Sequence, residues 1–579
     1  MSNLKNFLNF VVIFVLTFIT FFWTFYIFHY SFNLKIVLLV AVIRMLCSFF
    51  IFKDYSMSWQ KATPKSFLIK SFVYIVAFMI YMPIFYNTLP VSFFVSELFI
   101  YLFLINFLMY SYYLYMNRTN KNKKNKTLVI YGAGRAGMKL GEEYRNSEYK
   151  LLYYIDDDKH LQNRSIDGVK IISPQNAIKK FNKKEIDLLI IAMPSASQEQ
   201  IKHAYDMLEP YAEKIKILPS INEILKSELY SKQLKDISIE DLLARKPKDL
   251  DKNAIRNFVK GKIILITGAG GSIGSEICRQ CEKFGAKKLI LVENSEYNLY
   301  SINEELSIDR KCYMVDVTRK QELKKVFCKE KPDIVIHAAA YKHVPLCEEN
   351  PRSAVINNII GTKNSIDLSI EYKVKNFILI STDKAVRPTN IMGATKRVCE
   401  LYAQNIYSKN TKIAAVRFGN VLGSSGSVVP KFKKLIEEGK PLPVTHPEIT
   451  RYFMLIPEAC QLVLQAGSLA KNGEIFILDM GKPVKIIELA KKMLKMYGKD
   501  ENNIIITGLR PGEKLYEELL INDAEAKTIY DSIFVASPTY FDINKLNNLI
   551  YKLLKKYEKK EILKILKELV KEFNHKELN

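Results

Sequence analysis

The sequence predicts an α/β protein with three parts: an N-terminal anchor of four transmembrane helices, a Rossmann-like domain, and an extended Rossmann domain with a small C-terminal substrate-binding subdomain. Long apolar runs fill about the first fifth of the 579 residues. Two glycine-rich turns then each follow an apolar strand and open a helix, which is the pattern of a nucleotide-binding βα unit. A chain of this length is too long for one compact core, so several domains are expected.

Four apolar runs open the chain, roughly at residues 7–30, 34–52, 67–86 and 93–116. Each is close to the ~20 residues that span hydrocarbon. Residues 1–126 hold 12 Lys/Arg against 2 Asp/Glu, a net charge of +10, and lysine-rich segments follow the second and fourth runs. By the positive-inside rule we expect a multi-pass membrane protein, bound to the lipid bilayer, with both termini and the bulk of the chain in the cytoplasm.

Two charged residues, Arg44 and Glu97, lie inside these runs. They either mark a transport path or are paired within the anchor, and we favour pairing. The net charge of +25 is concentrated toward the membrane part, so we expect no nucleic-acid partner. The eight cysteines include one C-x-x-C pair, Cys278 and Cys281, but no second pair or His/Cys cluster at zinc spacing accompanies it, so we expect reduced cytosolic thiols and no metal site.

A transmembrane unit over 1–117 and a basic linker over 118–126 precede a Rossmann-like domain expected over 127–235. In this domain "GAGRAG" (132–137) follows an apolar strand, and Asp156 comes about twenty residues later. This is the context of a dinucleotide fingerprint, in which glycines let the backbone approach a pyrophosphate. No acid–base cluster follows, so a nucleotide-binding or regulatory role and a structural role stay equally open.

The second turn, "TGAGGSIG" (267–274), is the stronger signal and belongs to a domain expected over 236–579. Glu293 ends the next strand, where it can accept hydrogen bonds from both ribose hydroxyls and would repel a 2′-phosphate, so NAD is favoured over NADP. Asp316 ends a third strand, at a position suited to the adenine amino group. A small-residue floor follows the fourth strand, in "HAAA" (337–340).

These motifs, with "STDKAVRPTNIMGATK" (381–396), resemble those of an extended short-chain dehydrogenase/reductase. The resemblance is narrowed by three later stretches, "RFGNVLGSSGSVVP" (417–430), "HPEITRYFM" (446–454) and "TGLRPGEKLYEEL" (507–519). With the anchor and the extra Rossmann-like unit, the whole chain is similar to membrane-bound nucleotide-sugar 4,6-dehydratases of bacterial polysaccharide biosynthesis, the CapD family and in particular its PglF type.

The resemblance implies a reaction on UDP-N-acetylglucosamine with bound NAD. Oxidation of C4 to a ketone makes the C5 proton acidic, a base removes that proton, an acid protonates the departing C6 hydroxyl, and C6 is then reduced. The implied product is UDP-2-acetamido-2,6-dideoxy-4-keto-hexose, with retention at C5, for a surface glycan or protein glycosylation.

The resemblance also implies roles for individual residues. Lys384 is the C5 base and Asp383 the C6 acid, Thr382 hydrogen-bonds the reacting sugar hydroxyl, and Lys396 binds the nicotinamide ribose. Burial and the positive nicotinamide ring can lower the pKa of Lys384 from its ordinary value of about 10.4. Met392 replaces the usual tyrosine, and because a thioether carries no proton, the acceptor of the C4-hydroxyl proton is open among Asp383, Thr382 and a water.

The other expected contacts come from the same motifs. The expected cofactor-binding residues are Gly268, Gly271, Ser272, Ile273, Gly274, Glu293, Asp316, Val317, Ala338, Ala339 and Lys396. The expected substrate-binding residues are Lys342, His343, Asn420, Arg451, Arg510 and Glu513, with Arg510 the choice for the diphosphate.

The tail over 551–573 repeats apolar residues at helical spacing. We expect it to pack on the catalytic domain or between subunits, with membrane contact as the alternative. A homo-oligomer, a dimer or larger, is expected because the extended scaffold commonly dimerises through a helix pair.

Two other functions compete with the dehydratase. A nucleotide-sugar 4-epimerase shares the scaffold but relies on the missing tyrosine and has no use for the Asp383–Lys384 pair. A catalytically inactive membrane-bound sensor would bind NAD or UDP-sugars without turnover.

Overall fold

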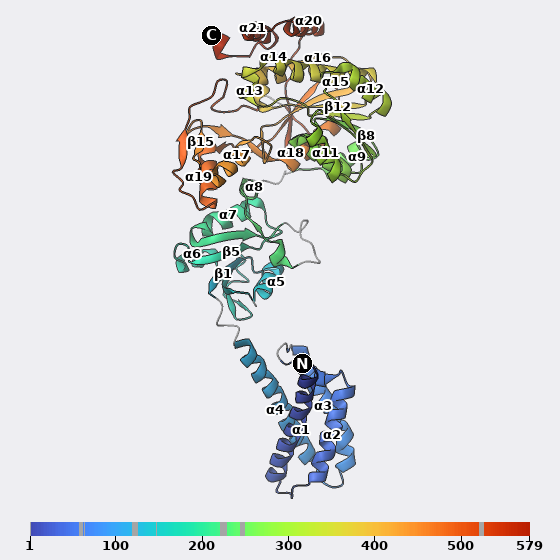
Figure 1. The fold of residues 1–579 in the computed structure, drawn as a ribbon, viewed down its shortest axis with the longest axis vertical. Coiled ribbons are helices and arrows are strands. Elements are labelled where there is room, and N and C mark those ends of the chain that lie inside the picture. The colour runs from blue at the N-terminus through green and yellow to red at the C-terminus, as the bar shows by residue number, and fades with distance from the viewer. Residues whose placement is uncertain are drawn as a thin grey trace. The chain divides into compact units, whose positions relative to one another are not determined.

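The computed structural model describes residues 2–56, 59, 62, 64–118, 125–145, 147–219, 229–243, 249–519 and 526–578. The chain forms two compact units (Figure 1). The first comprises Met1–Ala192, Tyr211–Lys214 and Ile224–Leu234, and the second comprises Met193–Pro210, Ile215–Glu223 and Lys235–Asn579.

All four predicted apolar runs are helical: α1 (Ser2–Ile27), α2 (Leu34–Phe50), α3 (Pro64–Phe85) and α4 (Val91–Arg118). By length and composition, three of the described helices are able to cross a membrane, α1, α3 and α4. Helix α2 has only 17 residues, fewer than the ~20 that span hydrocarbon. All four predicted runs are therefore helices, but the expectation of four transmembrane helices is met in length and composition by three of them.

The two charges inside the anchor form a buried ion pair, as favoured above. Arg44 donates from its two terminal nitrogens to Glu97 Oε1 (3.0 Å) and Oε2 (2.7 Å). Tyr81 donates its hydroxyl to Glu97 Oε2 (3.0 Å) and Thr20 donates to Oε1 (2.5 Å). Both side chains of the pair are fully buried. The pair holds together helices that the sequence separates, because a buried charge needs its partner.

The Rossmann-like part contains a seven-stranded sheet in the order β3-β4-β2-β1-β5-β6-β7. Its strands are β1 (Lys126–Tyr131), β2 (Tyr149–Ile155), β3 (Ser165–Ile166), β4 (Val169–Ile172), β5 (Ile186–Ile191), β6 (Ala212–Ile217) and β7 (Lys235–Asp236). The first glycine-rich turn joins β1 to α5 (Arg135–Tyr144). A Cβ on Gly137 would lie 1.8 Å from the carbonyl oxygen of Gly132, so this turn requires glycine. Asp156 accepts the N–H of Ala133 in the turn (2.7 Å).

The catalytic part is built on a nine-stranded sheet in the order β10-β9-β8-β11-β12-β13-β18-β22-β21. Its strands are β8 (Ile263–Thr267), β9 (Lys288–Glu293), β10 (Arg310–Met314), β11 (Ile334–His337), β12 (Asn376–Ile380), β13 (Lys412–Arg417), β18 (Glu474–Leu478), β21 (Ala526–Lys527) and β22 (Ile533–Val535). The strands from β10 to β18 are parallel, and β22 is antiparallel. The chain order reverses between β8 and β11, and such a switch point is where open α/β sheets bind ligands.

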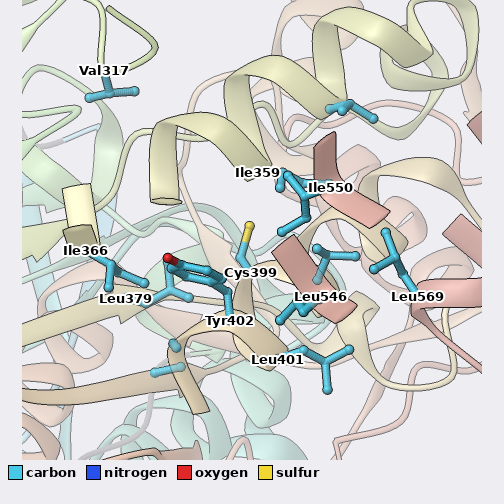
Figure 2. Close-up of a cluster of buried hydrophobic side chains, with 14 of the residues drawn as sticks. Val317, Ile359, Ile366, Leu379, Cys399, Leu401, Tyr402, Leu546, Ile550 and Leu569 are labelled. Carbon is cyan, nitrogen blue, oxygen red and sulfur yellow. The ribbon is translucent and has the colours of Figure 1, made fainter. Parts of the chain in front are cut away.

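Apolar side chains cover both faces of this sheet, as expected for buried parallel strands. Along β8, Leu265 belongs to one buried cluster, while Ile264 and Ile266 belong to the other. Figure 2 shows part of the first cluster, where Leu401 and Tyr402 lie beside Leu546 and other residues of the C-terminal helices. The main covering helices are α9 (Lys252–Val259), α10 (Ser272–Lys283), α11 (Glu296–Glu305), α12 (Lys320–Glu330), α15 (Gly361–Glu371), α16 (Ile391–Asn405) and α18 (Ile456–Leu469).

A smaller subdomain has its own apolar core, as predicted for the substrate side. It includes α17 (Val428–Glu437), α19 (Ile486–Met496), and the strand pair β15 (Leu442–Val444) and β20 (Ile504–Ile506). Phe432, Leu442 and Leu489 belong to this core.

The tail forms two helices, α20 (Ile543–Leu554) and α21 (Lys559–Leu569), rather than one. Their apolar faces join the cluster around α16, so the prediction that the tail packs on the catalytic domain is confirmed. Helix α16 is buried from Ile391 to Ala403, because the chain's own tail covers it.

Candidate active site

The sequence-predicted site residues meet at one cleft of about 920 Å³ in the catalytic part. The cleft lies at the carboxyl ends of the parallel strands, beside the switch point. From the predicted sets it is lined by Gly271, Ser272, Ile273, Gly274, Ala338, Lys342, His343, Thr382, Lys384, Met392, Lys396, Asn420, Arg451, Arg510 and Glu513. The remaining predicted residues, Gly268, Glu293, Asp316, Val317, Ala339 and Asp383, do not line it.

The glycine-rich turn lies close against neighbouring backbone. Gly268 has a φ of +65°, and a Cβ there would lie 2.8 Å from the amide nitrogen of Ala339. A Cβ on Gly274 would lie 2.0 Å from the carbonyl oxygen of Gly268. No side chain caps the start of α10 at Gly271, so the first N–H groups of that helix stay available to an anion in the cleft.

The two acidic residues expected at the cofactor lie at the carboxyl ends of β9 and β10: Glu293 is the last residue of β9, and Asp316 comes two residues after β10. Glu293 accepts the N–H groups of Gly270 (3.1 Å) and Asn294 (3.0 Å), which fixes its carboxylate against the glycine-rich turn. Asp316 accepts the N–H of Thr318 (2.8 Å). These positions follow the crevice outward from the turn, as expected for the ribose and adenine half of a dinucleotide.

The three central residues of the predicted catalytic set follow β12 directly, in a 3-10 turn (Asp383–Ala385). Asp383 Oδ1 accepts both the hydroxyl of Thr382 (2.8 Å) and the Nζ of Lys384 (3.0 Å). Lys384 also donates to Asn420 Oδ1 (3.2 Å). Asp383 is fully buried, and its Oδ2 has no hydrogen-bond partner among the described residues. The turn therefore presents a lysine to the cleft and keeps its paired carboxylate behind it.

The structure corrects one expectation about Lys384. Burial by itself lowers the pKa of Lys384, but the charges of Asp383 and Glu517 outweigh burial and raise it above its ordinary value. The expected lowering is therefore wrong for this protein without ligand, because two carboxylates stabilise the ammonium form.

Met392 and Lys396 lie one turn apart on α16, as the Tyr-x-x-x-Lys spacing requires. Met392 is 3% exposed and forms part of the cleft wall. Lys396 donates its Nζ to the carbonyl oxygen of Ile380 (2.7 Å), and burial lowers its pKa. The wall where a reductase has its phenol is thus apolar.

The predicted substrate residues form the opposite rim. Arg451 contacts Glu513 (3.4 Å) and the carbonyl oxygens of Thr450 and Lys514 (2.7 and 2.9 Å), so its guanidinium is held in place. Arg510 is exposed on the adjacent loop, where it is free to meet an anion.

Two further predicted contacts lie between the glycine-rich turn and this rim. Desolvation lowers the pKa of Lys342. Desolvation also lowers the pKa of His343, and the positive charge of Lys342 lowers it further. Both side chains line the cleft.

Sequence reasoning missed two groups behind the site. Glu517 lies in a motif quoted for the resemblance, yet only the fold brings its buried carboxylate to 3.7 Å from Lys384 Nζ. Glu400 is also fully buried, and it accepts hydrogen bonds from Ser381 (2.7 Å) and Arg417 (2.7 Å) behind the catalytic turn. The available signal for Glu400 was its place three and four residues after Arg397 and Lys396, a helical spacing that puts an acid beside two bases.

Comparison with known proteins agrees with this geometry. A family described as "Polysaccharide biosynthesis protein" matches residues 264–538, and one described as "C2185-like, N-terminal" matches residues 124–217. The Staphylococcus aureus "Capsular polysaccharide biosynthesis protein CapD" is 45% identical over 462 residues, which are 77% of this chain and 77% of that protein. A Campylobacter jejuni "UDP-N-acetylglucosamine 4,6-dehydratase (inverting)" (strain 81-176) is 36% identical over 48% of this chain and 84% of its own length.

A Rickettsia rickettsii "UDP-glucose 4-epimerase" is 34% identical over 46% of this chain and 80% of its own length. The match to CapD spans more than two thirds of both chains. This chain therefore belongs to the CapD family of polysaccharide biosynthesis proteins, and its catalytic part is an extended short-chain dehydrogenase/reductase.

Proposed function

We propose that this protein is an NAD-dependent UDP-N-acetylglucosamine 4,6-dehydratase that retains the C5 configuration and is anchored in the bacterial inner membrane with its catalytic part in the cytoplasm. One observation carries the proposal. Lys384, held by a 3.0 Å contact with the Asp383 carboxylate behind it, opens into the same cleft as the glycine-rich turn, and Met392 occupies the wall where a reductase needs a phenol. A relative named for dehydration of this substrate supports the dehydratase part of the proposal. That relative is named as inverting, so retention at C5 rests on the sequence resemblance alone.

The residues of the cleft fit a dinucleotide. The glycine-rich turn has no room for a side chain at Gly268 or Gly274. The N-terminus of α10 has no side-chain cap, which suits the binding of a pyrophosphate. Glu293 and Lys396 would hold the two riboses. When bound, NAD supplies reversible two-electron oxidation at C4 of the sugar.

The protein's own residues supply the proton transfers. Thr382 orients the sugar hydroxyl at C4. Asp383, paired with Lys384 in the free protein, would accept the C4 hydroxyl proton through Thr382 and then give that proton to the departing C6 hydroxyl, while Lys384 takes the C5 proton. Because Lys384 is held as an ammonium in the free protein, it must lose that proton before it acts as a base. Arg451 and Arg510 hold the diphosphate on the opposite rim.

A proton NMR time course tests the proposal. The full chain in detergent is mixed with UDP-N-acetylglucosamine and NAD in D2O. We expect a C6 methyl signal, deuterium at C5, and a C5 coupling pattern of retention, while Lys384→Ala lowers the rate about 10²–10⁴-fold.

Three other outcomes would each contradict part of the proposal. Inversion of the C5 coupling would contradict retention. Inversion at C4 without a methyl signal would establish an epimerase, the activity named for the Rickettsia relative. Unchanged substrate with bound NAD would establish a sensor.

A further inference from the structure

One oxygen of a buried carboxylate near the catalytic turn has no hydrogen-bond partner among the described residues. Glu517 is 7% exposed. Its Oε1 lies 3.7 Å from Lys384 Nζ and 3.8 Å from Arg451 Nε, which are charge contacts but longer than hydrogen bonds. Its Oε2 has no hydrogen-bond partner among the described residues. Burial of an unsatisfied carboxylate costs stability, so a functional reason for its place is expected.

The surroundings of Glu517 show what its charge acts on. Four charged side chains influence it, Lys384, Asp383, Arg451 and Lys514. Of the two cations that contact it, Arg451 is already held by Glu513 and by backbone carbonyl oxygens. Lys384 faces the cleft, and its charged neighbours are Asp383, Glu517 and Arg451. The group that responds to Glu517 is therefore Lys384.

We propose that Glu517 is a positioning residue that acts through Lys384, holding the amino group at the cleft wall and governing whether that group carries a proton. This inference deepens the proposed dehydratase function and rests on it for the role of Lys384 as a base. With Glu517 ionised, two carboxylates stabilise the ammonium form. With Glu517 protonated, Asp383 alone does so, and Lys384 gives up its proton more readily.

The pKa of Glu517 agrees with this role. Burial raises it above its ordinary value, and Asp383 raises it further, although Lys384 and Arg451 oppose the rise. A carboxyl group with a raised pKa takes up its proton at a higher pH than a surface glutamate does.

The test measures Lys384 directly, without turnover. The full chain in detergent is labelled with dinitrofluorobenzene, which reacts with the neutral amine, and modification of the Lys384 peptide is followed by mass spectrometry across pH. We expect Glu517→Gln to move the midpoint for Lys384 down by about 1 pH unit or more. Glu517→Asp keeps the charge and should restore the midpoint toward that of the parent.

The neighbouring Glu518 provides the matched control. It is paired with Arg387 (2.7 Å) and Lys514 (3.1 Å) outside the cleft, so Glu518→Gln should leave the Lys384 midpoint where it is. Equal midpoints in the parent and Glu517→Gln would overturn the inference. The labelling midpoint of Lys384 can also move in Glu517→Gln while neither the parent nor any variant dehydrates the sugar. In that case the inference stands and the proposed dehydratase function fails.

Discussion

Replacing Glu400 by alanine should destabilise the catalytic part strongly. Glu400 accepts from Arg417 at both carboxylate oxygens (2.7 Å each), from Ser381 (2.7 Å) and from Arg397 (3.2 Å), and it is fully buried. Its removal leaves two buried guanidinium groups without their shared counter-charge, which costs about 3–5 kcal/mol.

The adjacent Cys399 gives the assay. Cys399 is buried on the same helix, so a thiol reagent reaches it only after α16 opens. A loss of about 3–5 kcal/mol speeds its labelling roughly a hundredfold to a few thousandfold, since 1.4 kcal/mol is a factor of ten. The matched control is Glu322→Ala, which removes an exposed pair with Arg319 (3.3 Å) and should change labelling little. A change below about tenfold in Glu400→Ala would refute the assigned role of the buried network.

The same network gives a pH dependence with a definite sign. Burial alone raises the pKa of Glu400, but Arg417 and Arg397 outweigh it and lower the pKa below its ordinary value of 4.5. A lowered folded-state pKa adds stability that is complete above about pH 4.5 and is lost as pH falls toward the folded value. Labelling of Cys399 should therefore accelerate below that pH in the parent, and less so in Glu400→Ala. Equal acceleration in both proteins would show that other groups control acid unfolding.

Two further predictions concern the cofactor cradle and the anchor. Gly274→Ala places a Cβ 2.0 Å from the Gly268 carbonyl oxygen and should abolish NAD binding measured by calorimetry. The control is Gly134→Ala, whose new Cβ meets nothing within 4 Å and should leave NAD binding unchanged. If Gly274→Ala still binds NAD, the glycine-rich turn at 268–274 is not the NAD site. Arg44→Leu leaves Glu97 buried and uncompensated, so the anchor should unfold at a lower temperature by fluorescence of the chain's two tryptophans, both in this part. Replacing both Arg44 and Glu97 by leucine should recover much of the lost thermal stability. A double variant as unstable as Arg44→Leu would contradict the pairing argument.

The sequence alone determined the features that rest on local patterns. Apolar runs of spanning length became helices, and both glycine-rich turns lie between a strand and a helix. Thr382, Lys384 and Lys396 reached one cleft, with Asp383 directly behind it, because the ends of parallel strands converge at the switch point. These predictions succeeded because periodicity and turn chemistry act between residues close in the chain.

Only the tertiary structure decided the electrostatics of the site. Asp383 and Glu517 together reverse the expected direction of the Lys384 pKa, and although Asp383 is adjacent in the sequence, only the fold brings the distant Glu517 to 3.7 Å from Lys384. The division of the tail into two helices, and their packing on α16, likewise depend on a distant apolar surface. Burial and Coulomb energies depend on distance in space rather than on distance along the chain, so no local pattern reports them.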